Sequence, residues 1–501
     1  MASEYFFCYF AITYIRNIMA THPQWALKHK QKGTELRCIN GYYYLYEVTS
    51  KWDPDKKRSK KITGRLLGKI TRKDGFVESE KERLRKQRVT IENVKIKEYG
   101  VWSFIESHLA DYTGLIKKHF PGQWETIMGL VYGRLLYQSP LKNMGFHFQH
   151  SYMSEQFFDI DLSAKRLGQF LKELGYKRDV IVDFFKEFKT ANDCILFDGS
   201  DFCSESKKMG LCEFGMSKKG IYQQLVNTMF IFSVRQQLPI YYRLLPGNIK
   251  DVKAFKLCLK ESGVKDATII ADKGFYSKAN IERLDQESLA YIIPLRRDNT
   301  LINYGKLSSN DKKNFEGYFE FENRFVWYYT LEIKKENKKV YVYLDEELKT
   351  NEQKDYLLRV DKKIEGYSIE QFYEKQKAFG SIALYSNTSK TPKEIYIDYK
   401  SRNEIEGMID TLKNVLESDK TYMQNEQSLE GWMFINYIAL HWYYRVYQLL
   451  VKNDLNGKYS PYDLLQMLKE IRKVKINEQW YTGEIIQRTI DLLSKLKIPI
   501  T

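Results

Sequence analysis

Short apolar runs separated by turn residues dominate the middle of the chain. Runs of this length predict buried strands, and they lie at 194–197, 225–234, 238–245, 267–271 and 291–295. Helical spacing of apolar residues occupies the segment between the third and fourth runs, from Asp251 to about Gly263, and recurs between the fourth and fifth. Strands that come to alternate with helices indicate a mixed α/β sheet. We therefore expect residues 191–299 to form the first part of an α/β core.

The same pattern continues after an interruption. Residues 300–380 contain long strand-like segments, FEGYFEFENRFVWYYTLEI and KKVYVYL, and are predicted to be a β-rich insertion. The run SIALYSN at 381–387 and a helix from about Pro392 then resume the core over 381–423. Helical periodicity predicts a helical C-terminal region over 424–501.

Two further regions precede the core. Residues 1–80 read as a small β-rich unit with a strongly basic segment at 51–75, which is either a solvated hairpin or a contact for DNA phosphates. Residues 81–190 show helical spacing behind a basic lead-in, KERLRKQR, which suits a DNA-binding bundle and equally a packing scaffold. Residues 1–18 are either an upstream extension or an ordinary first element, because Met19 begins a more polar segment.

Composition narrows the class of protein. The chain of 501 residues is 43% hydrophobic with only 10 prolines, which excludes a mostly disordered chain. It carries 80 Lys and Arg against 64 Asp and Glu, a net charge of +16, and an excess of this size favours nucleic acid as the partner. The six cysteines include no CxxC pair, so zinc ribbons and thioredoxin-like sites are not expected. Scattered cysteines fit reduced thiols in a cytoplasmic protein.

No membrane segment is expected. The apolar stretch at 5–15 has neither a basic region before it nor a small-residue cleavage site after it. The stretch from Trp432 to Tyr444 is interrupted by Asn436 and His441, and it is shorter than the ~20 residues that a span needs. It is predicted to be a buried helix.

Two aspartates mark a candidate site in the core. Asp198 directly follows the run CILF, and Asp272 follows ATIIA. Ligand sites in open α/β sheets form outside the carboxyl ends of strands, so both carboxylates can face one crevice. Paired carboxylates in such a place suit Mg²⁺. Each aspartate alone would be read as a helix N-cap or a turn residue.

A third element is the helix that follows the insertion. Tyr399, Arg402, Glu406 and Lys413 are spaced by 3, 7 and 14 residues from the first. At ~100° per residue they fall on one face about 60° wide. A carboxylate flanked by two cations and a phenol suits a metal ion held against a phosphate backbone. The alternative is an exposed face laced with salt bridges.

These motifs together resemble a known family. Tyr399-x2-Arg402-x3-Glu406-x6-Lys413 is similar to the YREK signature of the bacterial DDE insertion-sequence transposases of the four-type superfamily. LFDGSDF and ADKGFYS resemble the first and second aspartate motifs of that family, and LLPGNIKD at 244–251 resembles the segment between them. The 134 residues from Asp272 to Glu406 match members with a β-rich insertion, and the resemblance covers about residues 190 to 450.

The resemblance implies an RNase H-like catalytic core and a chemistry for it. Asp198, Asp272 and Glu406 would be the catalytic triad and would hold two Mg²⁺ or Mn²⁺ ions. The enzyme would nick the ends of its element by hydrolysis and then join them to target DNA. Its partners would be double-stranded DNA, as terminal inverted repeats and as target, and a second copy of the chain in a homodimer.

Further residues acquire roles only through this resemblance. Tyr399, Arg402 and Lys413 would position the phosphates of the DNA end. Trp327 in the insertion is the candidate for stacking on a flipped base, although a core tryptophan is an equal reading.

Other polar residues near the motifs are left with two readings each. Asp201 is a rival to Asp198 as the first metal ligand, but Asp198 abuts the apolar run directly. Asn248 and Asp251 either support the site or, for Asp251, cap the following helix. Lys273 either contacts DNA or lies on the surface.

Three other functions remain as alternatives. A hydrolytic nuclease of RNase H-like fold would need neither the YREK face nor the insertion. A catalytically silent DNA-binding protein derived from a transposase would be favoured by the loss of a triad position, and all three are present. A basic RNA-binding module would show aromatic stacking motifs that are not seen here.

Overall fold

The computed structural model describes residues 22–54, 56–87, 94–217, 220–247, 251–308, 311–333, 337–416, 418 and 420–500. Residues 1–18, Asn248 and the side chain of Asp251, which carried predictions, lie outside this description. The chain divides into two compact units. Unit 1 comprises the residues up to Val94 with 476–478, and unit 2 comprises 95–475 and 479–501.

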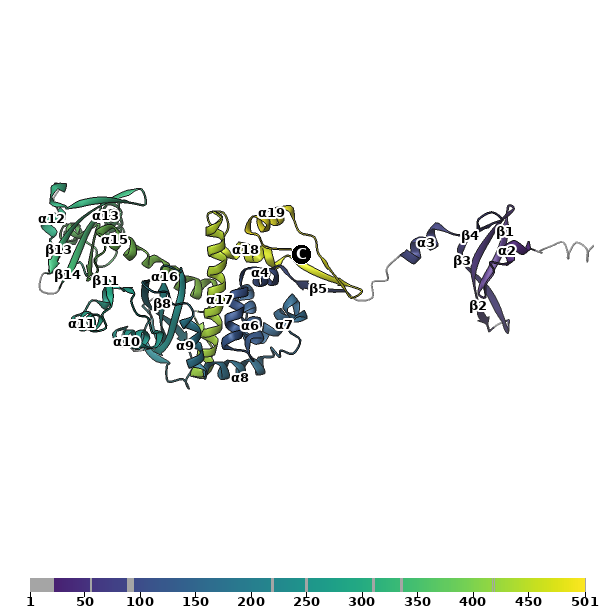
Figure 1. The fold of residues 1–501 in the computed structure, drawn as a ribbon, viewed down its shortest axis with the longest axis horizontal. Coiled ribbons are helices and arrows are strands. Elements are labelled where there is room, and N and C mark those ends of the chain that lie inside the picture. Colours follow the sequence, from purple (N-terminus) through teal and green to yellow (C-terminus); the bar gives the residue numbers. More distant parts are fainter. Residues whose placement is uncertain are drawn as a thin grey trace, which may run out of the picture. The chain divides into compact units, whose positions relative to one another are not determined.

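Unit 1 is a small antiparallel sheet (Figure 1). Its strands β1 (Thr34–Ile39), β2 (Tyr42–Asp53), β3 (Arg58–Thr71) and β4 (Gly75–Glu78) pair in chain order, and the short helices α2 (Gln24–Leu27) and α3 (Glu80–Gln87) flank them in the chain. Ala26, Leu36, Leu45 and Ile70 form its buried core. So small a core leaves much of the long hairpin β2–β3 exposed or only half-buried, and Lys51, Lys60 and Lys61 are exposed.

The core of unit 2 is a mixed sheet. Strands β6 (Cys194–Ser204), β8 (Tyr222–Ser233) and β9 (Leu238–Pro246) run antiparallel, and β7 (Glu213–Met216) pairs with the outer part of β8. Strands β10 (Thr268–Ile270) and β11 (Ala290–Pro294) lie parallel to β6 on its other side. Helices α10 (Asp251–Ser262) and α11 (Lys278–Gln286) fall between β9, β10 and β11 in the chain. This mixed α/β arrangement fits the RNase H-like core that was expected.

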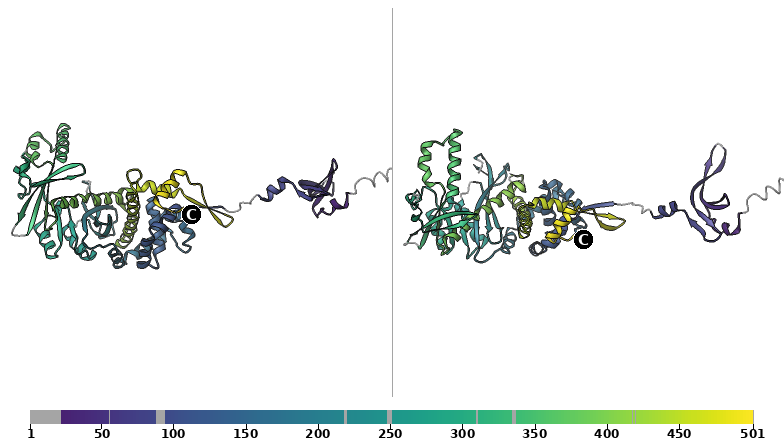
Figure 2. Two further views of the ribbon diagram at one scale, coloured as in Figure 1. Left: turned by 45° about the horizontal axis from the view of Figure 1, so that its top comes forward. Right: turned by 90° about the horizontal axis from the view of Figure 1, so that it is seen from above.

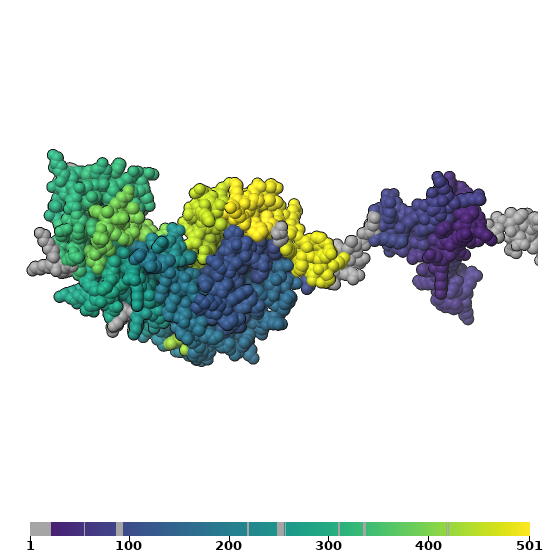
Figure 3. Space-filling view, viewed as in Figure 1, coloured from purple at the N-terminus to yellow at the C-terminus, as the bar shows by residue number. Residues whose placement is uncertain are grey.

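The insertion continues the core sheet. Strands β12 (Gly317–Phe321), β13 (Arg324–Ile333) and β14 (Lys338–Asp345) pair in sequence, β14 pairs with β15 (Ser381–Ser386), and β15 pairs with β11. The short helix α12 (Tyr304–Ser308) precedes these strands. In the space-filling view the insertion, coloured green, adjoins the teal core as a lobe (Figure 3).

The second half of the insertion corrects the β-rich prediction for 300–380. Residues 346–375 form the helices α13 (Glu346–Asp361) and α14 (Ile369–Lys375). The side chain of Asp345 accepts a hydrogen bond from the backbone N–H of Leu348, and Glu346 and Glu347 lie in the first turn. An N-cap followed by acidic residues stabilises a helix start, and this segment lacks the alternation of a strand.

A helical region precedes the core. Its main helices are α4 (Gly100–His108), α5 (Ala110–His119), α6 (Trp124–Tyr137), α7 (Met144–His150), α8 (Ala164–Gly175) and α9 (Arg178–Lys186). The long helix α17 (Glu426–Lys452) packs against α6, α8 and β9, so it connects the helical region with the sheet (Figures 1 and 2). Two glycines permit the close approach of α8 and α17, since a Cβ on Gly431 would lie 2.1 Å from the carbonyl oxygen of Leu171 and one on Gly175 would lie 1.8 Å from that of Gln427.

The remaining C-terminal elements are α18 (Pro461–Lys469), the strands β17 (Arg472–Ile476) and β18 (Gln479–Thr482), and α19 (Gln487–Leu496). Strand β17 pairs with β18 and with β5 (Val94–Glu98). Among the described residues, no helix is both long and apolar enough to cross a membrane. The stretch from Trp432 to Tyr444 lies within α17 and is mostly buried, as predicted.

Candidate active site

Asp198 and Asp272 lie on neighbouring inner segments of the core sheet, Asp198 within β6 and Asp272 just after β10. Strands β6 and β10 are parallel neighbours, with Leu196 opposite Ile270, and each aspartate comes two residues after that pair. Neighbouring strands are ~4.8 Å apart. The Oδ1 atom of Asp198 accepts a hydrogen bond from its neighbour's backbone N–H at 2.9 Å, and that of Asp272 does so at 2.6 Å. The parallel register therefore brings the two carboxylates close together, although β6 continues to Ser204 and Asp198 does not stand at the end of its strand as the sequence suggested.

The helix carrying the third acid is interrupted. It consists of α15 (Pro392–Lys400), a turn at Ser401, α16 (Arg402–Asp410) and a π-helical turn, η6 (Thr411–Val415). A capping box between Thr391 and Glu394, with Pro392 at the first position, starts it where the sequence predicted. The π-helical turn changes the angle per residue, so positions beyond Asp410 leave the face calculated for a regular helix.

Arg402 lies among the three acids. Its Nη1 atom is 3.0 Å from Oδ1 of Asp272, and its Nη2 atom is 3.2 Å from Oε1 of Glu406. Burial opposes the charge on the guanidinium, but the carboxylates of Asp272, Asp198 and Glu406 outweigh this effect and raise the pKa of Arg402. The guanidinium of Arg402 thus interacts electrostatically with all three predicted triad residues, which come from β6, the segment after β10 and α16.

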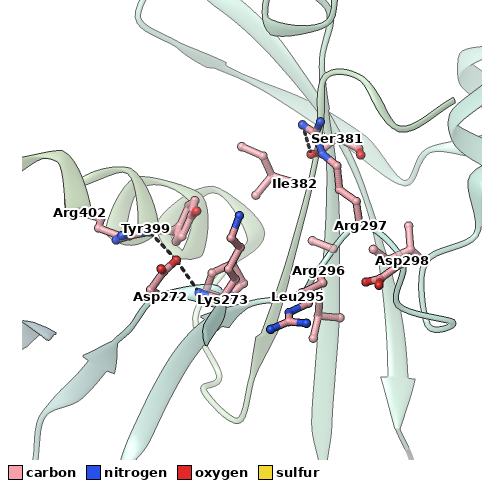
Figure 4. A pocket seen from close by; sticks show the side chains of 13 residues that line it. Asp272, Lys273, Leu295, Arg296, Arg297, Asp298, Ser381, Ile382, Tyr399 and Arg402 are labelled. Atoms are coloured by element: carbon pink, nitrogen blue, oxygen red, sulfur yellow. Dashed lines mark hydrogen bonds and ion pairs between the residues drawn. The ribbon is translucent and has the colours of Figure 1, made fainter. Parts of the chain in front are cut away.

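Glu406 and Tyr399 complete this group. The side chain of Glu406 is 57% exposed, so it can reach a bound substrate. Tyr399 is half-buried on α15, and burial raises the pKa of its phenol, which therefore stays neutral at ordinary pH. Figure 4 shows Tyr399 and Arg402 on the same helical segment, facing Asp272 and Lys273.

Lys413 lies elsewhere. Its Nζ atom is 2.8 Å from Oδ1 of Asp201, and both side chains are largely buried, with 20% and 12% exposed. Asp201 and Asp198 are three residues apart on one strand, so their side chains point to opposite faces of the sheet. The structure thus pairs Asp201, the rival metal ligand, with Lys413 and leaves Asp198 facing Arg402.

Trp327 lies in the interior of the insertion sheet. It is on β13, half-buried, with its ring centroid 5.1 Å from that of Tyr318 and 6.0 Å from that of Phe315. It does not line the cavity beside Asp272. The aromatic residue that does so is Tyr399.

A cavity of about 740 Å³ adjoins Asp272 and has a basic wall. Lys273, Arg296, Arg297 and Arg402 all contribute to this wall (Figure 4). Arg297 is held in place because its Nη2 atom lies 2.7 Å from Oε1 of Glu352 on α13. From the sequence, Lys273 was expected either on DNA or on the surface, and the two arginines were missed. Arg296 and Arg297 could have been found from their position directly after the run YIIPL, because ligand sites form at the carboxyl ends of such strands.

The donor set suits a divalent cation. Carboxylate oxygens are the ligands that Mg²⁺ takes in proteins, and the three acids already surround one positive group. No three acids, histidines or cysteines in the described parts of the chain are grouped closely enough to form a metal centre with the side chains as they stand. Arg402 bridges Asp272 and Glu406 in this arrangement. The three carboxylates therefore have the right chemistry for a divalent metal ion. For them to close around such an ion, Arg402 must move away from Asp272 and Glu406.

Comparison with known proteins defines the class. Residues 193–442 match the protein family described as the transposase DDE domain, a segment that contains Asp198, Asp272 and Glu406. This match supports a DDE-type transposase, a class of enzymes that cleave DNA and transfer strands. A search of curated proteins gave no match.

One solved structure is similar in part. It is the cryo-EM structure of a piggyBac transposase synaptic complex with hairpin DNA, with 10% sequence identity and a TM-score of 0.38. The similarity covers 74% of this chain and 75% of that chain.

Proposed function

We propose that this protein is a cut-and-paste transposase of the bacterial insertion-sequence type carrying the YREK signature. One observation supports this function most strongly. Asp198, Asp272 and Glu406, from three separate elements inside the matched domain, converge on a single guanidinium beside a basic cavity. Such a cavity suits the phosphates of a DNA strand, which must lie against the acids for hydrolysis or transfer.

In this proposal Asp198, Asp272 and Glu406 hold divalent metal ions, Mg²⁺ or Mn²⁺, most simply two. The ions would supply an activated oxygen nucleophile and stabilise the leaving oxygen of the phosphodiester. The rest of the work falls to the chain itself. Lys273 and Arg296 bind phosphate oxygens along the cavity, and the neutral phenol of Tyr399 donates a hydrogen bond to the backbone of the bound strand.

Arg402 binds the carboxylates in the free protein and a DNA phosphate in the complex. In the free protein it neutralises Asp272 and Glu406. When a DNA strand enters, its guanidinium moves to the phosphate, for which its planar donors are well suited. Lys413 supports the site by fixing Asp201, and Trp327 remains a prediction as a stacking residue.

The larger assembly is also part of the proposal. The basic hairpin β2–β3 of unit 1 contacts DNA phosphates, and the active species is a homodimer holding two terminal inverted repeats. Neither point affects the chemistry assigned to the triad.

The test is a reaction with DNA ends and a target together. Purified protein is incubated in Mg²⁺ with a duplex carrying the terminal repeat of its element and with a supercoiled target plasmid. The proposal expects nicks at the repeat boundary and then joined products in which the repeat is attached to the plasmid. Nicks without joining would instead support a hydrolytic nuclease. Binding without any cleavage in Mg²⁺ or Mn²⁺ would support a silent DNA-binding protein.

A further inference from the structure

A second hollow lies further along the strand that carries Asp198. It has a volume of about 410 Å³ and is lined by Phe214, Tyr222 and Tyr422 together with Lys420 and the end of β6. We call these four side chains and the hollow between them the aromatic groove. The three rings are 58%, 66% and 81% exposed, respectively. Three large aromatic side chains exposed around one hollow mark a binding surface.

The walls of the aromatic groove are held by strand pairing. Phe214 and Tyr222 come from the β7–β8 hairpin, with ring centroids 5.7 Å apart and planes inclined by 24°. Lys420 belongs to β16 (Lys420–Thr421), which pairs in parallel with Cys203 and Ser204 of β6. Tyr422 follows this strand directly. Two of the rings are thus presented on paired strands and the third directly follows a paired strand, which makes them suitable as a stacking platform.

The charge around the groove favours a polyanion. Lys420 is exposed at its rim, and Lys207 and Lys208 are exposed in the connection that follows β6. Glu205 is the acidic residue among those that line the groove. Exposed aromatic faces beside lysines are the combination by which proteins hold unpaired nucleotides, since each base offers a face for stacking and each phosphate a charge.

The groove also lies within reach of the triad. Asp198 and Cys203 are five residues apart on β6, roughly 17 Å along the strand. A third cavity, of about 650 Å³, shares Lys420 and Tyr422 with the groove and includes Lys413, whose partner is Asp201. This third cavity therefore leads from the groove to Asp201, on the face of the sheet opposite Asp198, and the groove approaches the triad along β6 itself.

We infer that the aromatic groove binds an unpaired nucleotide of the DNA strand that is processed at the triad. This inference rests on the proposed function, because it takes its ligand from the substrate proposed there. The base stacks on Tyr422 and on the Phe214–Tyr222 pair, and Lys420 contacts its phosphate. The groove thereby holds a strand that has separated from its complement roughly 17 Å along β6 from the triad.

The experiment measures stacking directly. The probe is a short duplex with a single-stranded tail that carries 2-aminopurine, whose fluorescence falls when the base stacks on an aromatic ring. Glu406→Gln protein is used throughout, so that no cleavage occurs. We expect this protein to quench the tail, and Tyr422→Ala in the same background to abolish the quenching and to weaken binding of the tailed duplex roughly tenfold. Tyr422→Phe should keep both.

Matched controls separate stacking from a general loss of binding. Tyr373 is 63% exposed on α14 and lines none of the three cavities, so Tyr373→Ala should behave as the parent protein. Binding of a fully paired duplex should be the same for Tyr422→Ala and the parent. Equal melting temperatures exclude misfolding for these exposed positions.

Three results would overturn the inference. They are unchanged quenching in Tyr422→Ala, an equal loss on tailed and paired duplexes, and a change in sedimentation that assigns the groove to a second copy of the chain. Because the assay uses inactive protein, it is read separately from cleavage. Absent stacking alongside Glu406-dependent nicking would reject the groove and leave the proposed function standing, whereas stacking without nicking in the active protein would reject the enzyme.

Discussion

At the scale of single residues, Arg402 is the side chain that links the acids of the candidate site. It lies 3.0 Å from Asp272 and 3.2 Å from Glu406, and it also feels the charge of Asp198. A guanidinium bound to two proposed metal ligands competes with the metal ion for them. In the free protein the site is therefore weakened toward metals, and a DNA phosphate that draws Arg402 away restores it.

We predict that Arg402→Gln strengthens metal binding in the absence of DNA. Removing the cation should tighten Mn²⁺ binding roughly tenfold, about 1.4 kcal/mol, a modest value because both carboxylates are partly exposed to solvent. Titration of free protein with Mn²⁺, followed by electron paramagnetic resonance, measures it. Lys273→Gln serves as the control. It also removes a cation from the cavity wall, but the side chain of Lys273 makes no hydrogen bond to Asp272 or Glu406. Weaker binding in Arg402→Gln would show that the arginine supports the metal site.

The sequence located most of the candidate site because its determinants are local. Asp198 and Asp272 directly follow apolar runs, and Arg402 and Glu406 are one helical turn apart, so neither relation depends on distant contacts. Lys413 was placed on the same face because a regular helix was assumed. The π-helical turn at Thr411–Val415 turns it toward Asp201, and no local pattern announces such a turn.

Glu261 illustrates a half-buried charge that serves stability. Burial by itself would raise its pKa, but Arg178 at 2.9 Å, Tyr241 and Arg243 at 2.6 Å stabilise the carboxylate and lower the pKa to about 2 from the ordinary 4.5. The folded pKa is below the unfolded one. The stabilisation is therefore complete above about pH 4.5 and is lost as the pH falls toward 2.

Glu261→Gln should accordingly destabilise the protein at neutral pH, by about 2 kcal/mol for a charged hydrogen-bonded group. The difference from the parent should shrink steadily below pH 4.5. Urea unfolding at several pH values measures it. Glu282→Gln, whose side chain is 58% exposed, is the control and should change little at any pH. A difference that persists unchanged at pH 3 would contradict the assigned pKa.

At the scale of elements, the contact of α8 with α17 fixes the helical region against the core. The two helices approach so closely that a Cβ on Gly431 would lie 2.1 Å from a backbone oxygen of Leu171. A rigid backbone atom cannot yield as a flexible side chain can. Gly431 is thus required by packing, although helix propensity alone favours alanine there.

We predict that Gly431→Ala destabilises the protein by roughly 1–3 kcal/mol or more, because the helices must separate. A Cβ on Gly168 of α8 would meet no heavy atom within 4 Å, so Gly168→Ala should instead stabilise the protein by roughly 0.5–1 kcal/mol. Thermal unfolding of the two variants measures both effects. Similar melting temperatures for the two would contradict the close approach.

The positions of the strands were predicted better than the pairing between them. The apolar runs at 225–234, 238–245 and 291–295 correspond to β8, β9 and β11, because strands buried on both faces are continuously apolar. The joining of the insertion to the core through β14, β15 and β11 was not predicted. Pairing between strands that are distant in the sequence depends on the whole sheet, so the residues of one strand do not indicate which strand it will pair with.

At the scale of the whole molecule, the net charge of +16 should govern affinity for DNA. Each phosphate neutralised contributes about −0.9 to the slope of log affinity against log salt. We predict a steep slope for the full chain and a shallower slope for residues 95–501, which lack the basic hairpin of unit 1. Fluorescence anisotropy on one duplex across a salt series measures both. Equal slopes would mean that the hairpin is a solvated surface, the alternative that the sequence left open.

The measurement that tests the central claim most directly compares two acids on one helix. Glu406 is assigned to the triad, whereas Asp410 lies four residues later on α16, exposed, with its Oδ1 atom accepting a hydrogen bond from Asn414. Glu406→Gln and Asp410→Asn remove the same charge from the same element. Nicking of a duplex that carries the terminal repeat is measured in Mg²⁺, with a gel shift to confirm that each protein binds it. We predict that Glu406→Gln binds the duplex and does not nick it, while Asp410→Asn nicks it as the parent protein does. Nicking by Glu406→Gln at the parent rate would contradict it.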